Sequence, residues 1–210
     1  MSTILVDGAS TAYGYYDAQY HGWANRLRLS VLPGIQLAPH SPIVVDNVAF
    51  PGKTITSLLR DASANLDSHT GRSTTLTSVL SVGINESKIM PGEQRPALGL
   101  NRFGWAVKRY VEYCDGYGAG VVLVGPQPAA DETLVSSFTG ATIERDLTEE
   151  YAEIMRSVAD ETGAAFVDAY ALFGEEPEAY LSSDRVHPNA LGHAVLYDAI
   201  QKELRTFGAL

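Results

Sequence analysis

Short apolar runs alternate with longer amphipathic segments along the whole chain. The apolar runs are nearly continuous and do not alternate with polar residues, which is typical of parallel strands covered on both faces. Five of them are predicted as strands: residues 3–6, 43–48, 76–82, 121–124 and 165–167.

The segments between these runs show helical periodicity, and they predict helices over residues 18–32, 55–66, 98–114, 148–162 and 189–204. In the last segment, we expect one apolar face made of Ala190, Leu191, Ala194, Val195, Ala199 and Leu204. Alternating strands and helices imply right-handed crossovers between parallel strands. The sequence therefore predicts an α/β fold, a three-layer α/β/α sandwich around a five-stranded parallel sheet. Nothing in the sequence resembles a linker or a repeat, so a single domain over residues 1–210 is expected.

Polar residues follow several of the predicted strands at the point where each strand ends. Ser10 follows the first strand, Gly52 the second and Asn85 the third, and a loop over residues 183–188 precedes the last helix. In open parallel sheets, ligands bind beyond the carboxyl ends of the strands. We therefore expect these positions to converge on one edge of the sheet.

Two of these positions supply the residue types that nucleophilic catalysis needs. A serine hydroxyl is a poor nucleophile at neutral pH unless an adjacent base, oriented by a third group, removes its proton. Ser10, His187 and Asp184 have the chemistry for these three roles. Each also has an ordinary structural explanation, because Ser10 could cap a helix, Asp184 could cap a turn and His187 could be a simple loop residue. Gly52 and Asn85 could likewise be turn residues.

Composition excludes several other classes of protein. The formal charge of −10, with scattered basic residues, argues against nucleic-acid binding. Cys114 is the only cysteine, so an intramolecular disulfide is impossible, and no ligand spacing suggests a metal site. No apolar run reaches the roughly 20 residues of a membrane helix, so no membrane insertion is expected. The first strand begins almost at Met1 without a signal-peptide pattern, which predicts a cytoplasmic protein, although a trimmed secreted protein would look the same.

Four short sequence blocks, and their order along the chain, resemble those of the SGNH-hydrolase superfamily, also known as GDSL-type esterases and lipases. The blocks are Ser10, Gly52, Asn85 within the stretch Gly-Ile-Asn-Glu, and Asp184 with His187 at the Asp-x-x-His spacing. The resemblance implies the flavodoxin-like fold of that superfamily and a triad of Ser10, His187 and Asp184. It also implies an oxyanion hole formed by the backbone N–H groups of Ser10 and Gly52 and the side-chain amide of Asn85. No cofactor or metal is implied.

The chain departs from the family pattern at three positions. Ala9 stands where the nucleophile block usually has aspartate, Thr11 follows where leucine is usual, and Glu86 replaces the aspartate that usually follows the asparagine. None of these changes removes a group that performs chemistry. What they put in question is the local hydrogen bonding that shapes the nucleophile turn and the angle at which Asn85 is held.

Aromatic residues cluster just after the nucleophile, where they could line a substrate pocket or simply pack at a helix start. The cluster contains Tyr13, Tyr15 and Tyr16, of which Tyr13 and Tyr15 are the candidate pocket residues. Asp7, just before the turn, is a candidate for supporting the nucleophile indirectly.

The sequence thus predicts a serine hydrolase that cleaves carboxylic esters with short acyl groups, such as acetyl esters of sugars or small aryl and alkyl esters. A lysophospholipase or thioesterase of the same family is an alternative, and so is a module on the same fold that binds a glycan or ligand without catalysis. A flavodoxin-like binding module is a further alternative, but it leaves the Asp184 and His187 pair unexplained. An α/β-hydrolase proper is disfavoured because its nucleophile elbow reads G-x-S-x-G, whereas Thr11 is followed here by Ala12. A small-molecule ester is the expected partner, and the sequence does not predict an oligomeric state.

Overall fold

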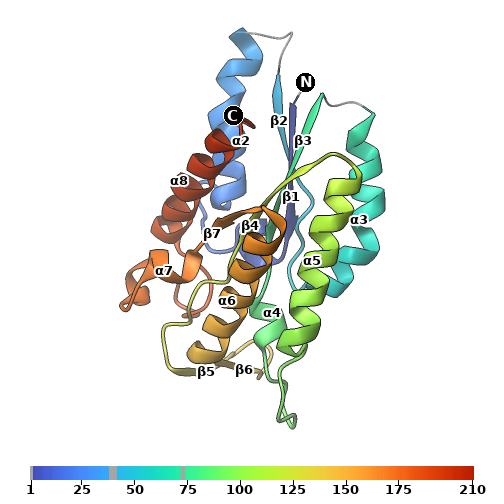
Figure 1. The fold of residues 1–210 in the computed structure, drawn as a ribbon. Coiled ribbons are helices and arrows are strands. Elements are labelled where there is room, and N and C mark those ends of the chain that lie inside the picture. Colours follow the sequence, from blue (N-terminus) through green and yellow to red (C-terminus); the bar gives the residue numbers. More distant parts are fainter. Residues whose placement is uncertain (1, 38–41, 72–73) are drawn as a thin grey trace.

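The structure, a computed structural model, describes residues 2–37, 42–71 and 74–210. A five-stranded parallel sheet forms its centre, with strand order β2-β1-β3-β4-β7. Figure 1 shows this sheet between two layers of helices. The strands are β1 (Ser2–Gly8), β2 (Ile43–Asn47), β3 (Thr75–Ser81), β4 (Gly120–Val124) and β7 (Ala165–Val167). The predicted α/β fold and the five-stranded parallel sheet are confirmed.

Each face of the sheet is covered by its own group of helices. Helices α2 (Gly22–Leu37) and α8 (Ala190–Thr206) cover one face, and α3 (Ile55–Thr70), α5 (Leu100–Gly116) and α6 (Arg145–Thr162) cover the other. Successive residues of a strand point to opposite faces. Accordingly, Ile4 packs with Trp23 and Leu196 in one core, while Leu5 packs in the other.

The sequence missed several short elements between the main ones. These are helices α1 (Ser10–Tyr13), α4 (Ile84–Ser87) and α7 (Ala169–Phe173), a 3-10 helix (Pro177–Tyr180), and an antiparallel hairpin of β5 (Thr133–Val135) and β6 (Thr142–Glu144). The start of α2 was also predicted too early. Asp17 accepts hydrogen bonds from the backbone N–H groups of Tyr20 and Gly22, and the resulting turn delays the helix. Elements of three to five residues carry too little periodicity to be seen in a sequence.

The apolar face predicted for the last helix is only partly correct, because Leu204 is buried and Ala199 packs against the core, but other predicted members do not lie on the buried face. Ala190 and Leu191 are exposed, and the buried face of α8 contains His193, Leu196 and Ile200. Positions three or four residues apart share one face of a helix, and this series continues to Leu204. The prediction placed part of the apolar face incorrectly because several small alanines make two neighbouring faces of this helix equally apolar in the sequence.

The loops beyond the carboxyl ends of the strands are joined to one another by backbone hydrogen bonds. Val48 donates to the carbonyl of Val6, and Phe50 donates to that of Gly8. On the other side of β1, the N–H of Ala9 donates to the carbonyl of Ser81. These bonds bring the segments that follow β1, β2 and β3 to a single edge of the sheet.

Within the described ranges, no helix combines the length and apolar character needed to cross a membrane.

Candidate active site

The turn after β1 presents Ser10 at the start of helix α1. Gly8 has a φ of +151°, and a Cβ added there would lie 2.4 Å from the backbone oxygen of Ser81. Only glycine tolerates this conformation and this close approach. The N-cap of α1 is Ala9, so Ser10 does not serve as the helix cap that the sequence left open.

The hydroxyl of Ser10 lies directly against the imidazole of His187. The distance from Ser10 Oγ to His187 Nε2 is 2.7 Å, and His187 Nδ1 lies 2.5 Å from Asp184 Oδ2. A carboxylate can only accept a hydrogen bond, so Nδ1 carries the proton and Nε2 is free to accept one from the serine. The structure thus joins three residues from opposite ends of the chain in the order that proton transfer from the serine requires.

Asp184 is fixed by the loop that carries it. Its Oδ1 accepts hydrogen bonds from the Ser182 hydroxyl and from the backbone N–H groups of Val186 and His187. Burial acts to raise the pKa of Asp184, but the hydrogen bonds from His187, Ser182 and the backbone outweigh it and hold the pKa well below its usual range. The carboxylate therefore stays ionised wherever His187 can act as a base.

A strained residue lies between Asp184 and His187. Arg185 has a φ of +64°, in the left-handed region that non-glycine residues rarely adopt. Its guanidinium makes two hydrogen bonds of 2.7 Å each to the carboxylate of Asp131, which hold the side chain in place. Strain of this kind persists only where the surroundings over-determine it, and it concentrates at functional sites.

Gln127 connects helix α1, which begins at Ser10, to the loop that carries His187. It follows β4 and is buried, and its amide nitrogen donates to the carbonyl of Val186 at 2.9 Å and to the hydroxyl of Thr11 at 3.3 Å. Thr11, next to Ser10, and Val186, next to His187, are therefore both hydrogen-bonded to the same buried side chain. The usual leucine at the position of Thr11 could not accept this hydrogen bond.

The sequence predicts three N–H donors for an oxyanion, from Ser10, Gly52 and Asn85, and the structure brings two of them to the same cavity. Ser10 and Asn85 line one small cavity, and Asn85 Nδ2 donates at 2.8 Å to the carbonyl of Lys53, next to Gly52. Gly52 has a φ of +79° in the turn after β2. Within the described part of the chain, the backbone N–H groups of Ser10 and Gly52 donate to no protein acceptor. An N–H group without a protein acceptor is available to a ligand.

Glu86 links the asparagine block to the segment that carries Gly52. Its carboxylate accepts hydrogen bonds from the N–H of Ile55 at 2.5 Å and from the N–H of Gly83 at 2.9 Å. Burial raises the pKa of Glu86. An aspartate side chain is one methylene shorter, so the glutamate gives the reach needed to join the starts of α3 and α4.

Asp7 supplies a buried carboxylate beneath the turn that carries Ala9 and Ser10. It is fully buried, and it accepts hydrogen bonds from the N–H of Gly8 at 3.0 Å and from the hydroxyl of Tyr110 at 3.3 Å. That hydroxyl also pairs with Ser78. Burial raises the pKa of Asp7 to about 6.

The raised pKa of Asp7 predicts a pH-dependent stability. Between the unfolded value of 3.8 and about 6, the folded state binds more protons than the unfolded state. The free energy of unfolding should therefore fall as pH rises through this window and stay flat above it, by up to about 3 kcal/mol for this group. Asp7→Asn cannot ionise, so it should become more stable relative to wild type by most of this amount between pH 4 and pH 8. Urea unfolding at both pH values measures the difference.

The matched control for this prediction is Asp160→Asn, which changes an exposed carboxylate. Its stability relative to wild type should stay nearly constant between the two pH values. An equally constant difference for Asp7→Asn would show that Asp7 is ionised without penalty in the folded protein.

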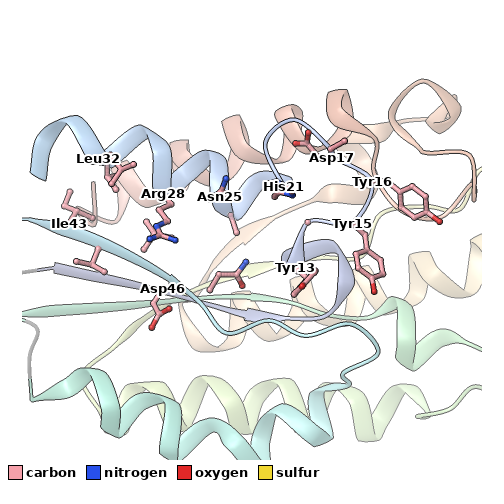
Figure 2. Close-up of a pocket in the computed structure, with 17 residues that line it drawn as sticks. Tyr13, Tyr15, Tyr16, Asp17, His21, Asn25, Arg28, Leu32, Ile43 and Asp46 are labelled. Atoms are coloured by element: carbon pink, nitrogen blue, oxygen red, sulfur yellow. The ribbon is translucent and has the colours of Figure 1, made fainter. Parts of the chain in front are cut away.

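Tyrosines form a wall beside the histidine and lead into a groove. The ring centroids of Tyr15 and Tyr16 each lie 5.6 Å from that of His187, and Tyr13 packs edge-on against Tyr15. Tyr13, Tyr15 and Tyr16 are among the residues that line a groove of about 780 Å³ between α2 and the edge strand β2, and they lie at one end of it. Figure 2 shows Asn25, Arg28 and Asp46 farther along the same groove. Tyr13 and Tyr15, the candidate substrate-pocket residues of the sequence, are both among the residues that line this groove.

His193 forms a hydrogen bond with the backbone of the loop that carries Tyr15 and Tyr16. The Nε2 of His193 donates to the carbonyl of Tyr15 at 2.9 Å, and its Nδ1 accepts from the N–H of Trp23 at 3.3 Å. Burial lowers the pKa of His193 and so favours the neutral ring that this pattern needs. Tyr16 has a φ of +65°, a second strained residue beside His187.

Sequence reasoning missed the site roles of Tyr16, Gln127 and Lys88. Tyr16 belongs to the tyrosine cluster, but nothing in the sequence distinguishes the ring that packs on His187. Gln127 follows a strand like the other site residues, which is a usable signal. Lys88 donates to Asn85 Oδ1 at 2.7 Å, and no motif marked it.

Within the described ranges, no group of three or more His, Cys, Asp or Glu side chains could hold a metal ion.

Comparison with known proteins gives the following similarities. The model of the GDSL-like Lipase/Acylhydrolase family matches residues 8–195. An acetylxylan esterase of Geobacillus stearothermophilus is 36% identical over 64 residues, and this stretch spans 29% of the chain and 29% of that relative's length.

Solved structures extend the likeness over nearly the whole chain. Axe2, an acetylxylan esterase from Geobacillus stearothermophilus, has a TM-score of 0.72 at 21% identity, covering 97% of this chain and 94% of that one. A lipase/acylhydrolase from Enterococcus faecalis has a TM-score of 0.74 at 18% identity, covering 98% and 96%. At such identities, the likeness shows a shared fold.

Proposed function

This chain belongs to the GDSL-like lipase/acylhydrolase family, and we propose that it cleaves short-acyl carboxylic esters with Ser10 as nucleophile, His187 as base and Asp184 as the third member. Membership confirms the predicted family and the predicted class of ester hydrolase, and it replaces the flavodoxin-like alternative. The observation that carries the proposal is the hydrogen-bonded series from Ser10 Oγ through His187 to Asp184.

In the first half of the reaction, Ser10 Oγ attacks the acyl carbonyl while His187 Nε2 takes its proton. The bond to the alcohol then breaks, and the imidazolium returns the proton to the leaving oxygen. Asp184 holds the ring and stabilises its positive charge. In the second half, water attacks the acyl-enzyme, His187 again takes and returns a proton, and the carboxylic acid leaves.

The oxyanion of each tetrahedral intermediate is assigned to three donors. They are the backbone N–H groups of Ser10 and Gly52, and the Nδ2 proton of Asn85 that is not bonded to Lys53. Donors fixed before the reaction stabilise the charge without reorganising. Glu86 supports this arrangement because it ties the start of α4 to the start of α3.

The solved relatives support the same assignment. Catalytic mutants of Axe2 replace one serine, one aspartate and one histidine by alanine, and that aspartate and histidine are three positions apart. Asp184 and His187 have the same spacing and follow the serine in the same order.

The space around Ser10 favours a small acyl group. The cavity next to the serine, lined by Gly83, Asn85 and Pro126 among others, has a volume of only about 10 Å³. That is about the room of a single water molecule. A long acyl chain cannot enter a cavity of this size, which supports the proposal of a small acyl group.

The leaving alcohol is assigned to the tyrosine groove, and we propose that it is a sugar. Exposed faces of Tyr13, Tyr15 and Tyr16 offer flat apolar surfaces for a sugar ring. Amide, guanidinium and carboxylate groups of Asn25, Arg28 and Asp46 in the groove can bind its hydroxyls. Acetylated saccharides combine this alcohol with the small acyl group, and the similar acetylxylan esterases act on such esters by name.

A chain-length series of p-nitrophenyl esters tests the acyl assignment. Acetate should be cleaved fastest, and kcat/KM should fall by at least about tenfold by octanoate, because each methylene without a place in the pocket costs binding free energy. Acetylated xylo-oligosaccharides, followed by acetate release, test the alcohol assignment in parallel.

The other outcomes point to the alternatives. A maximum at long chains, or faster cleavage of lysophospholipids or acyl thioesters, would contradict the short-acyl proposal and favour those substrates. Absence of hydrolysis with every ester would favour a binding module without catalysis.

A further inference from the structure

Lys88 lies at the candidate oxyanion site with its charge partly withdrawn from water. It directly follows helix α4 and is half-buried, and its ammonium donates to Asn85 Oδ1 at 2.7 Å. Burial lowers the pKa of Lys88, while the negative charges of Glu86 and Asp184 act to raise it. A long lysine side chain normally keeps its ammonium in water, so this position needs a specific partner.

That partner, Asn85, has both ends of its amide fixed. The ammonium of Lys88 can only donate, so the atom facing it must be the amide oxygen. The carbonyl of Lys53 can only accept, so the atom facing it must be the amide nitrogen. The two partners leave the amide one orientation, in which a single N–H of Asn85 remains for a ligand.

We propose that Lys88 is a positioning residue that orients the Asn85 amide and strengthens its remaining N–H as a donor to the oxyanion. This inference rests on the proposed function, because it assumes that Asn85 binds the oxyanion. A positive charge on the amide oxygen draws electrons away from the nitrogen, which makes the N–H a better donor. Charge-assisted hydrogen bonds are about twice as strong as neutral ones, and linked hydrogen bonds polarise each other.

A role of Lys88 through Asn85 and a direct electrostatic role of its ammonium predict different results. If Lys88 acts through Asn85, its removal matters only while the amide is present. If the ammonium contacts the substrate or the oxyanion itself, its removal matters equally without the amide. A double-mutant cycle separates the two, since coupled residues are non-additive.

The variants are Lys88→Met, Asn85→Ala and the double variant, with Lys108→Met as the matched control. Lys108 is a partly exposed lysine that pairs with Glu161 and lies outside the site. Removing an oxyanion donor costs about 10²–10³ in kcat, so Lys88→Met, which leaves the donor but loosens it, should lower kcat about 10-fold to 100-fold. KM should change by less than about threefold, because the loss occurs only in the transition state. Lys88→Arg should restore much of the activity, and Lys108→Met should match wild type.

In the Asn85→Ala background, Lys88→Met should lower kcat by less than about twofold further. A trifluoromethyl ketone that forms an oxyanion with the serine should bind Lys88→Met more weakly by the same factor as kcat, with acetate binding unchanged. Thermal unfolding of each variant shows that the fold is kept.

Several outcomes would overturn the inference. They are an unchanged kcat in Lys88→Met, an equal loss in both backgrounds, or a KM that rises while kcat stays constant. If Asn85→Ala lowers kcat and Lys88→Met does not, only this inference fails. A wild-type protein that hydrolyses no ester overturns the proposed function and this inference with it.

Discussion

Ser10→Ala is expected to lower kcat/KM for p-nitrophenyl acetate by about 10⁵-fold, with the fold intact. Among the residues that the structure describes, the hydroxyl of Ser10 is the one group within hydrogen-bonding distance of His187 Nε2. Members of a nucleophile–base pair act as a unit, so losing one costs about as much as losing all of them. His187→Ala should therefore show a similar loss, and the double variant should be no worse. Steady-state kinetics with purified variants measure all three.

The control for this prediction is Ser137→Ala, which removes an exposed hydroxyl in the β5–β6 loop. Its activity should equal that of wild type. Hydrolysis by Ser10→Ala at more than about one hundredth of the wild-type rate would mean that another group attacks the ester.

Asp184→Asn is expected to lower kcat by about 10⁴-fold while leaving the loop in place. The amide oxygen can replace Oδ1 as acceptor for Ser182 and for the backbone N–H groups of Val186 and His187. The amide nitrogen would then face His187 Nδ1 and donate to it. The ring would carry its proton on Nε2, toward Ser10, and could not accept the serine proton. Steady-state kinetics give the size of the loss, and thermal unfolding checks that the loop is intact.

Asp198→Asn, which changes an exposed carboxylate on α8, is the control and should be fully active. A loss of less than about tenfold in Asp184→Asn would show that the histidine does not depend on this carboxylate for its orientation.

The sheet and the residues at its edge were predictable because they depend on patterns within single segments. Apolar runs such as residues 121–124 identify strands without any knowledge of their neighbours. Once the strands are parallel, their carboxyl ends must meet at one edge, which places Ser10 near Asn85. The Asp-x-x-His spacing then lets one loop hold both Asp184 and His187.

The supporting residues were not predictable because each depends on a contact between distant segments. The bond from Tyr110 to Asp7 joins α5 to β1, and Gln127 joins helix α1 to the loop that carries His187. Lys88 became visible only when its ammonium was found on Asn85. Side-chain direction within a short helix such as α4 cannot be read from hydrophobic periodicity, because four residues barely make one turn.

The most direct test of a serine hydrolase built on Ser10 is covalent trapping of its nucleophile. A small alkyl fluorophosphonate forms a stable ester with an activated serine, and peptide mass spectrometry locates the modified residue. We expect one adduct per chain, on Ser10, with labelling lost in Ser10→Ala and strongly slowed in His187→Ala because the base is absent. An adduct on any other residue, or an unlabelled Ser10 in a protein that hydrolyses esters, would contradict the account.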